Sequence, residues 1–161
     1  MVRNLNCGRD LGGHRMGSQT AFCYGVGVNP AALDLDHELR RLAWKVEAGA
    51  QFAITQPVFD PAQFEAFLTL ARPFGIPIVA GVWPFASHRN AEFMANEVPG
   101  VSVPRDVLRR MEKADSRGDG PAEGVAIARE MLTRFRADIA GVQVSAPLGR
   151  VSLALAVLEG S

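Results

Sequence analysis

The polar residue with the clearest chemical role in this sequence is Gln56. It closes an apolar run that begins at Phe52 and ends in Thr55-Gln56-Pro57, and Asp60-Pro61 then opens a helical pattern. In α/β folds with parallel strands, ligands bind at the carboxyl ends of the strands. A glutamine neither titrates nor attacks, but it donates and accepts hydrogen bonds, so Gln56 is suited to orienting a flat, amide-like heterocycle. The alternative is an amide that hydrogen-bonds neighbouring backbone, and spacing alone weighs the two equally.

Three further amides and one arginine lie close to predicted strand ends. Asn29 and Asn90 are weaker candidates of the same kind as Gln56, whereas Gln143 is better explained as a satisfied amide. Arg150 follows the last predicted strand and opens the final helix. An arginine beside the free N–H groups of a helix start is well placed to bind a carboxylate or a phosphate.

Charged side chains elsewhere give weaker signals. Arg41 and Lys45 are one helical turn apart, so both can reach one anionic group, although spacing alone favours a solvated helix face. The histidines match no metal-ligand spacing, and no Ser-His-Asp or Cys-His order stands out. The sequence therefore predicts neither a metal site nor a nucleophilic catalytic site.

Composition narrows the class of protein. The chain has 161 residues with 48% apolar content, enough for one domain with a core, and 17 basic residues balance 17 acidic ones. A net charge of zero gives no electrostatic field that would attract nucleic acid or an anionic membrane. No apolar run reaches the ~20 residues that a membrane span needs. Cys7 and Cys23 are too few for a disulfide framework, so we expect reduced, buried or half-buried thiols and a cytoplasmic location.

Strands and helices are predicted to alternate along most of the chain. Residues 1–20 have no clean period and are interpreted as a leader or loop, and residues 21–161 as the structured segment. The predicted strands begin near Phe22, Phe52, Ile78 and Val142. The predicted helices cover 34–49, 61–75, 87–94, 104–111, 121–135 and 151–158.

This alternation predicts an α/β fold with a parallel sheet. Strands that are apolar on both faces and alternate with helices form parallel sheets, and neighbouring units cross over right-handed. The four βα units amount to half of a TIM (β/α)8 barrel, whose typical length is ~250 residues. The turn pattern Gly-x-Gly-x-x-Gly follows none of the strands, which argues against a dinucleotide-binding doubly wound sheet.

Several ordered motifs resemble the methylenetetrahydrofolate reductase family. They are the segments 26–30 (VGVNP), 45–50 (KVEAGA), 54–60 (ITQPVFD), 80–84 (AGVWP), 89–93 (RNAEF) and 96–101 (NEVPGV). The last two look most like the reductase half of the bacterial bifunctional homocysteine methyltransferase/reductase proteins. The resemblance runs from about Asn4 to the end of the chain.

The resemblance implies a flavoprotein that passes a hydride from NADH or NADPH to FAD and then to 5,10-methylenetetrahydrofolate, giving 5-methyltetrahydrofolate. It assigns substrate-binding positions to Gln56, Asn90, Phe93, Met94 and Arg150. The choice between Phe93 and Met94 depends on a one-residue gap. It assigns flavin-binding positions to Lys45 and, less directly, to Glu38 and Arg41.

The same resemblance places the family's catalytic glutamate and flavin-tuning aspartate on earlier strands, so no catalytic residue is expected in this chain. Activity of the chain alone is therefore in question. One alternative is a non-catalytic half-barrel that assembles with a chain carrying the N-terminal half. Another is an unrelated barrel enzyme of the aldolase or methyltransferase kind, which the ordered motifs disfavour. Open sheet edges predict a homo-oligomer or a partner that supplies the missing half.

Overall fold

A single parallel sheet with the strand order β1-β2-β3-β4 forms the centre of the protein. The computed structural model describes residues 1–159, so the last two residues of the predicted structured segment lie outside it. The strands are β1 (Gly25–Val28), β2 (Phe52–Pro57), β3 (Ile78–Val82) and β4 (Gly141–Val144). Their order and parallel pairing confirm the predicted α/β fold, which has the arrangement of a partial (β/α)8 barrel.

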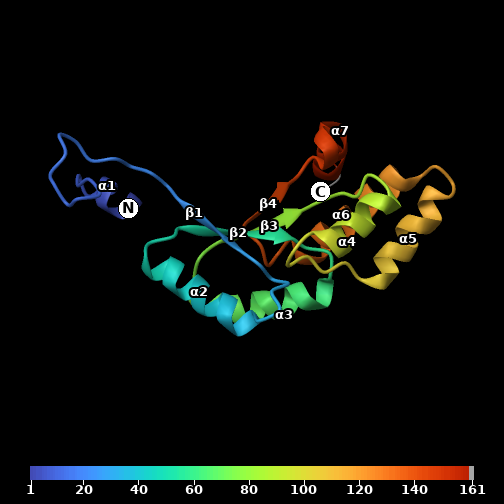
Figure 1. Ribbon diagram of the computed structural model, residues 1–161, viewed down its shortest axis with the longest axis horizontal. Helices are drawn as coiled ribbons and strands as arrows, with labels where there is room; N and C mark the ends of the chain where they lie inside the picture. Colours follow the sequence, from blue (N-terminus) through green and yellow to red (C-terminus); the bar gives the residue numbers. More distant parts are fainter. Residues whose placement is uncertain (160–161) are drawn as a thin grey trace.

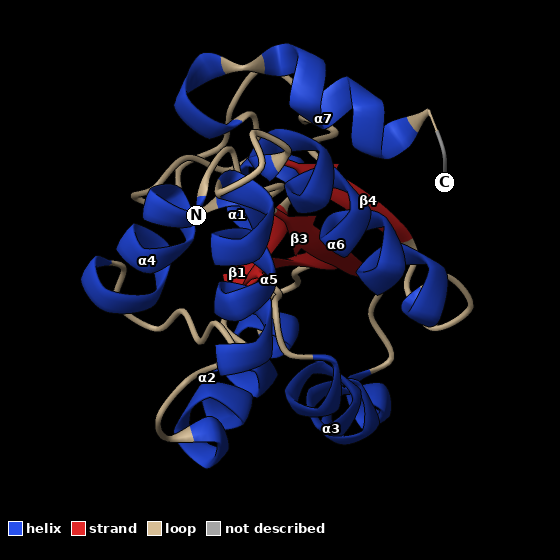
Figure 2. Cartoon of the chain, turned by 90° about the vertical axis from the view of Figure 1, so that its right-hand side faces the viewer, coloured by secondary structure: helices blue, strands red, loops and turns tan. Residues whose placement is uncertain are grey.

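The helices cover one face of the sheet and its carboxyl end (Figures 1 and 2). Helices α2 and α3 lie along the sheet, α4 and α5 lie beyond the carboxyl ends of the strands, and α7 lies beside β4 (Figure 1). The helices are α1 (Val2–Asn6), α2 (Leu35–Glu47), α3 (Pro61–Ala71), α4 (His88–Glu97), α5 (Arg105–Asp115), α6 (Gly120–Phe135) and α7 (Val151–Leu158), with short 3-10 turns η1 (Arg72–Phe74) and η2 (Pro147–Gly149).

Three of these helices begin at side-chain caps. Asp34 accepts a hydrogen bond from the backbone N–H of His37 at 2.8 Å and thereby starts α2. Asp60 accepts from two backbone N–H groups of α3, and Pro61 occupies the first turn, where a missing N–H costs nothing. Ser87 accepts from the backbone N–H of Asn90 and starts α4. All three starts match the sequence prediction.

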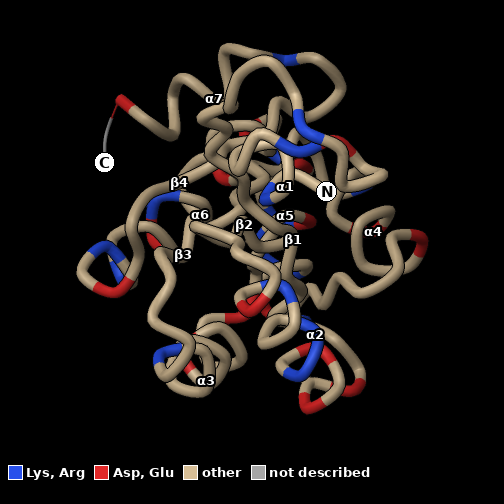
Figure 3. The backbone as a smooth tube through the Cα atoms, turned by 90° about the vertical axis from the view of Figure 1, so that its left-hand side faces the viewer, with Lys and Arg blue, Asp and Glu red and all other residues tan. Residues whose placement is uncertain are grey.

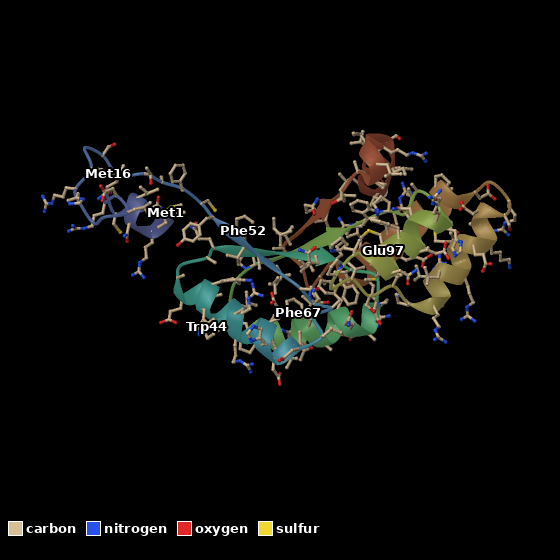
Figure 4. The ribbon with its side chains drawn as sticks, in the orientation of Figure 1. Met1, Met16, Trp44, Phe52, Phe67 and Glu97 are labelled. Carbon is tan, nitrogen blue, oxygen red and sulfur yellow. The ribbon has the colours of Figure 1, made fainter. Side chains whose placement is uncertain are left out.

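Alternation along each strand divides the side chains between two faces. One face packs on α2, α3 and α6 and forms the main core. The buried core residues of this face are Val28, Leu42, Ala53, Val58, Phe64, Phe67, Ala71, Ile78, Ala80, Met131 and Phe135. Phe67 lies between α3 and the sheet (Figure 4). The opposite face is the one that a closed (β/α)8 barrel turns inward.

The N-terminal segment differs in two respects from the prediction. Residues 2–6 form the short helix α1, which stands beyond the amino ends of the strands (Figure 1). The first strand begins at Gly25 instead of near Phe22, because strand pairing with β2 starts at Gly25 opposite Phe52. Within the described residues, no helix is long and apolar enough to cross a membrane.

Cys7 and Cys23 lie in and just after this segment. Both are free and exposed, so the expectation of buried or half-buried thiols is wrong. The reason is that the chain from Cys7 to Cys23 does not pack against the sheet.

Candidate functional site

A pocket of about 690 Å³ lies on the inner face of the sheet, toward the carboxyl ends of the strands. Its lining combines aromatic, amide and hydroxyl side chains. The lining residues are Gly25, Val26, Gly27, Phe52, Ile54, Thr55, Gln56, Pro57, Trp83, Asn90, Phe93, Met94, Val98, Gln143, Ser145 and Leu148. None of these residues is ionisable, and Figure 3 shows that charged residues belong to helices and loops rather than to the strands. Such a lining suits a flat, uncharged ring with polar edges.

Alternation along β2 turns Gln56 into this pocket, on the same face as Phe52 and Ile54, which also line it. The register between β2 and β3 shifts between Ile54 and Pro57, where Pro57 has no N–H to donate. The Thr55 hydroxyl takes the place of a ladder acceptor, because its oxygen accepts from the backbone N–H of Gly81 at 2.8 Å. Gln56 is exposed on the pocket wall, as sequence reasoning required for a ligand-binding amide.

Helix α4 places three of the expected substrate-binding residues at the pocket. Asn90 is 9% exposed, and its Oδ1 accepts from Trp83 Nε1 at 3.2 Å and from the backbone N–H of Ala86 at 3.3 Å. Because that oxygen is already occupied, Asn90 offers its NH₂ group to the pocket. Phe93 is 55% exposed and Met94 is 4% exposed, so Phe93 presents the larger free surface.

The two remaining candidates at strand ends lie beside the pocket and do not line it. Arg150 is exposed at the start of α7, two residues beyond the lining residue Leu148. Asn29 follows β1 and uses its Oδ1 to accept from the backbone N–H of Ala31 at 3.0 Å. The structure thus brings together Gln56, Asn90, Phe93 and Met94, and leaves Arg150 at the rim.

The expected flavin-binding residues gather at the free edge of β1. Tyr24 C=O accepts from Gln51 N–H, so alternation turns the Gly27 carbonyl and the Asn29 N–H away from β2. Lys45 Nζ donates to that Gly27 carbonyl at 2.7 Å, and Glu38 Oε1 accepts from the Asn29 N–H at 3.2 Å. A residue of a neighbouring parallel strand would make the same two bonds.

Glu38 also lies within ion-pair distance of two cations of α2. Its carboxylate lies 3.6 Å from Lys45 Nζ and 3.5 Å from Arg41 Nη1, and Glu38 itself is 7% exposed. Two cations facing one carboxylate leave a net positive charge, and the half-exposed Arg41 guanidinium keeps donors free for a ligand. This donor set fits the phosphate part of a flavin nucleotide. Glu38, whose oxygen is bonded to backbone, has the least capacity for a ligand.

Sequence reasoning missed two pocket residues. Gln143 was explained as a satisfied amide and Ser145 received no role, and both line the pocket, Gln143 from β4 and Ser145 from the residue after it. The available signal was alternation, because Val142 and Val144 face the helices and so turn Gln143 inward.

Comparison with known proteins agrees with this geometry. The family model for methylenetetrahydrofolate reductase matches residues 15–144, which is most of the chain. Methylenetetrahydrofolate reductase 1 of Schizosaccharomyces pombe is 28% identical over 121 residues, covering 71% of this chain and 20% of that protein. The probable methylenetetrahydrofolate reductase (NADPH) of Caenorhabditis elegans is 32% identical over 91 residues, covering 55% of this chain and 13% of that protein.

A solved structure shares the fold. It is described as an uncharacterized protein from Clostridium thermocellum that binds two copies of 5-methyl-5,6,7,8-tetrahydrofolic acid, and it superposes with a TM-score of 0.57 at 20% identity. The match covers 83% of this chain and 51% of that one. This chain thus spans a fifth or less of the curated relatives and about half of the structural neighbour. The match over residues 15–144 shows that the chain belongs to the methylenetetrahydrofolate reductase family.

Proposed function

We propose that the inner-face pocket binds the pterin ring of a reduced folate. The observation that carries this proposal is Gln56, an exposed amide at the end of β2 that lines an uncharged pocket. Its carboxamide offers one acceptor and two donors, which is the pattern needed along the edge of a pterin. Asn90 adds an NH₂ donor, and Phe93 supplies an exposed aromatic face for stacking. Family membership and the folate bound by the structural neighbour support the same substrate class.

We further propose that the site works with FAD and with NADH or NADPH, as the family does. Arg41 and Lys45 would hold the anionic part of the flavin nucleotide at the carboxyl end of β1, and Arg150 at the pocket rim is suited to a folate carboxylate. A flavin, when bound, supplies hydride transfer. The likeness of segments 89–93 and 96–101 to the bacterial bifunctional proteins makes a reductase half of that kind our preferred assignment.

Catalysis needs groups beyond this pocket. No titratable side chain lines it, so the pocket by itself offers no general acid or base. We therefore propose that the chain contributes substrate binding, and that a segment with the preceding strands contributes the proton-transfer group. The isolated chain would then bind folate but catalyse its reduction slowly or not at all.

The experiment is a folate titration of the purified chain followed by tryptophan fluorescence. A Trp44→Phe background removes the exposed tryptophan of α2 (Figure 4) and leaves Trp83, which lines the pocket, as the reporter. We expect 5-methyltetrahydrofolate to quench Trp83, and Gln56→Leu to weaken binding about tenfold through the loss of one or two hydrogen bonds. Gln63→Leu, on α3 outside the pocket, is the matched control.

A chain that gives no saturable quenching at millimolar folate would overturn the proposed function. Equal affinity in the Gln56→Leu and Gln63→Leu variants would remove Gln56 from the site while leaving the pocket assignment standing.

A further inference from the structure

Gln143 and Ser145 form a polar pair that the assigned site does not use. Gln143 Nε2 donates to Ser145 Oγ at 3.1 Å, and both residues line the inner-face pocket, Gln143 from β4 and Ser145 from the residue after it. This bond fixes the carboxamide, so that Gln143 Oε1 and the second N–H remain free. The Ser145 hydroxyl accepts from Gln143 and therefore still has its own proton to donate. The pair thus presents one acceptor and two donors in a fixed arrangement.

The position of Gln143 is unusual for a parallel strand. Parallel strands in α/β folds are normally apolar on both faces, and the inner-face residues Ile54 on β2 and Val79 on β3 follow that rule. Alternation places Val142 and Val144 against the helices, so Gln143 is the residue of β4 that turns inward at this level. An amide at that position gives up apolar packing. A ligand that hydrogen-bonds the amide explains why a glutamine stands at this position.

The strand between Gln143 and Gln56 carries a glycine, Gly81, at their level. Gln143 is in register with Gly81 on β3, and Gly81 is in register with Pro57, the residue after Gln56. Gly81 has no side chain, because a Cβ there would come within 2.3 Å of the Thr55 carbonyl oxygen. The backbone of Thr55 and Gln56 thus fills the space that a side chain at Gly81 would take. The two amides lie about two strand spacings apart, about 9.6 Å of sheet, and both line the pocket.

We propose that the Gln143–Ser145 pair is a second hydrogen-bonding edge of the pocket and determines its specificity for a ring that is polar on two opposite sides. Gln56 binds one edge of the ring from β2, and Gln143 with Ser145 binds the other edge from the end of β4. A fused bicyclic heterocycle with donors and acceptors along both sides meets this demand, whereas a ring polar on one side leaves a desolvated amide unpaired. The inference rests on the proposed folate site and adds the residues that select its ring.

The test compares two ligands in the Trp44→Phe background. One is 5-methyltetrahydrofolate, and the other is 6-methyltetrahydropterin, which has the same ring system without the benzoyl-glutamate tail. We expect Gln143→Leu to weaken both ligands by a similar factor of about tenfold, and Ser145→Ala by about threefold to fivefold. Equal factors for the two ligands identify the ring as the part that Gln143 contacts.

Matched controls separate binding from folding. Gln63→Leu on α3 and Ser152→Ala on α7 make the same chemical changes outside the pocket and should leave both affinities unchanged. Leucine suits a strand better than glutamine, so Gln143→Leu should melt no lower than the parent.

Unchanged affinity for both ligands in Gln143→Leu would overturn the inference alone, because folate binding by the parent would stand. A loss confined to 5-methyltetrahydrofolate would also overturn it by placing Gln143 at the tail. A parent chain that binds neither ligand would overturn the proposed function and the inference together.

Discussion

Glu38 is a buried carboxylate that hydrogen-bonds the backbone. It accepts from the Asn29 N–H at 3.2 Å and lies within ion-pair distance of Arg41 and Lys45. With Lys45 bonded to the Gly27 carbonyl, the pair satisfies two backbone groups that an edge strand leaves open. The side chains of α2 therefore close the carboxyl end of β1, beside the place proposed for a flavin nucleotide.

Two substitutions at Glu38 separate its hydrogen bond from its charge. Glu38→Gln keeps an oxygen for the Asn29 N–H and loses only the ion pairs, so we expect a loss of about 1 kcal/mol in the free energy of unfolding. Glu38→Ala also leaves the Asn29 N–H without its acceptor, and we expect a loss of about 2 to 3 kcal/mol. Urea unfolding curves give both values, and equal losses would mean that the backbone bond contributes nothing.

Single residues show how far sequence reasoning reaches into the site. Gln56 was found because it stands at the end of an apolar run, which is a local pattern. Gln143 was interpreted as a satisfied amide, and it does donate to Ser145, but its place in the pocket follows only from the pairing of the strands. The hydrogen bond between Glu38 and the Asn29 N–H depends on which side of β1 that N–H group points to, and the sequence alone does not reveal this.

Element boundaries were likewise predicted correctly where they depend on local contacts and misplaced where they depend on distant ones. The starts of α2, α3 and α4 were predicted because their caps are short-range hydrogen bonds within a few residues. The start of β1 was placed too early because a strand begins where its partner begins, and β2 offers its first paired residue, Phe52, opposite Gly25. Figure 4 shows Phe52 at that position, where β1 passes over β2.

A charged clamp joins α5 to α6. Arg110 donates to Glu130 through both terminal nitrogens, at 2.7 and 2.8 Å, and through Nε to Glu123 at 2.7 Å. The hydrogen bond from Arg110 lowers the pKa of Glu130 below its ordinary value of 4.5, against the opposing effect of partial burial, and raises the pKa of Arg110. A carboxylate with a lowered pKa stabilises the fold above its unfolded pKa and ceases to do so as pH falls through its folded pKa.

The clamp therefore predicts a pH-dependent difference in stability. At pH 7 Glu130→Gln should lower the free energy of unfolding by only about 0.5 to 1 kcal/mol, because the Glu130 side chain is 60% exposed and solvent screens the pair. The difference from the parent should shrink as the pH falls below 4.5, since the unfolded chain then takes up the proton first, and it should vanish once the pH is below the lowered pKa of Glu130 in the folded parent. Thermal melts between pH 7 and pH 3 measure it. Glu112→Gln, an exposed α5 position with no ion pair among the described residues, should show no such trend, and a difference that grows toward low pH would contradict the clamp.

The sheet of this protein is open, and its two edge strands differ in how much of their free backbone edge is covered. Both β1 and β4 end the sheet, and the Glu38–Lys45 pair covers the carboxyl end of β1 only. Next to β4, the helix α7 carries an exposed apolar stripe at helical spacing, which Leu148 of η2 extends. The members of this α7 stripe are Leu148, Val151, Leu155 and Leu158, exposed by 78%, 58%, 51% and 45%. The free edge of β4 and the α7 stripe are therefore two neighbouring features suited to contact with another chain or segment.

We therefore predict that the 161-residue chain alone associates through its β4 and α7 side, with a second copy or with a chain that carries the preceding strands. Exposed apolar surface costs ~25 cal/mol per Å², so covering the stripe favours assembly. Light scattering at micromolar concentration should show a dimer or larger species. Val151→Lys with Leu155→Lys should shift the chain toward monomer, whereas Leu70→Lys, at a comparably exposed leucine on α3, should not. A parent chain that is a monodisperse monomer with a cooperative melt would contradict the prediction, because α1 and its loop stand beyond the amino ends of the strands and do not cover the inner face (Figure 1).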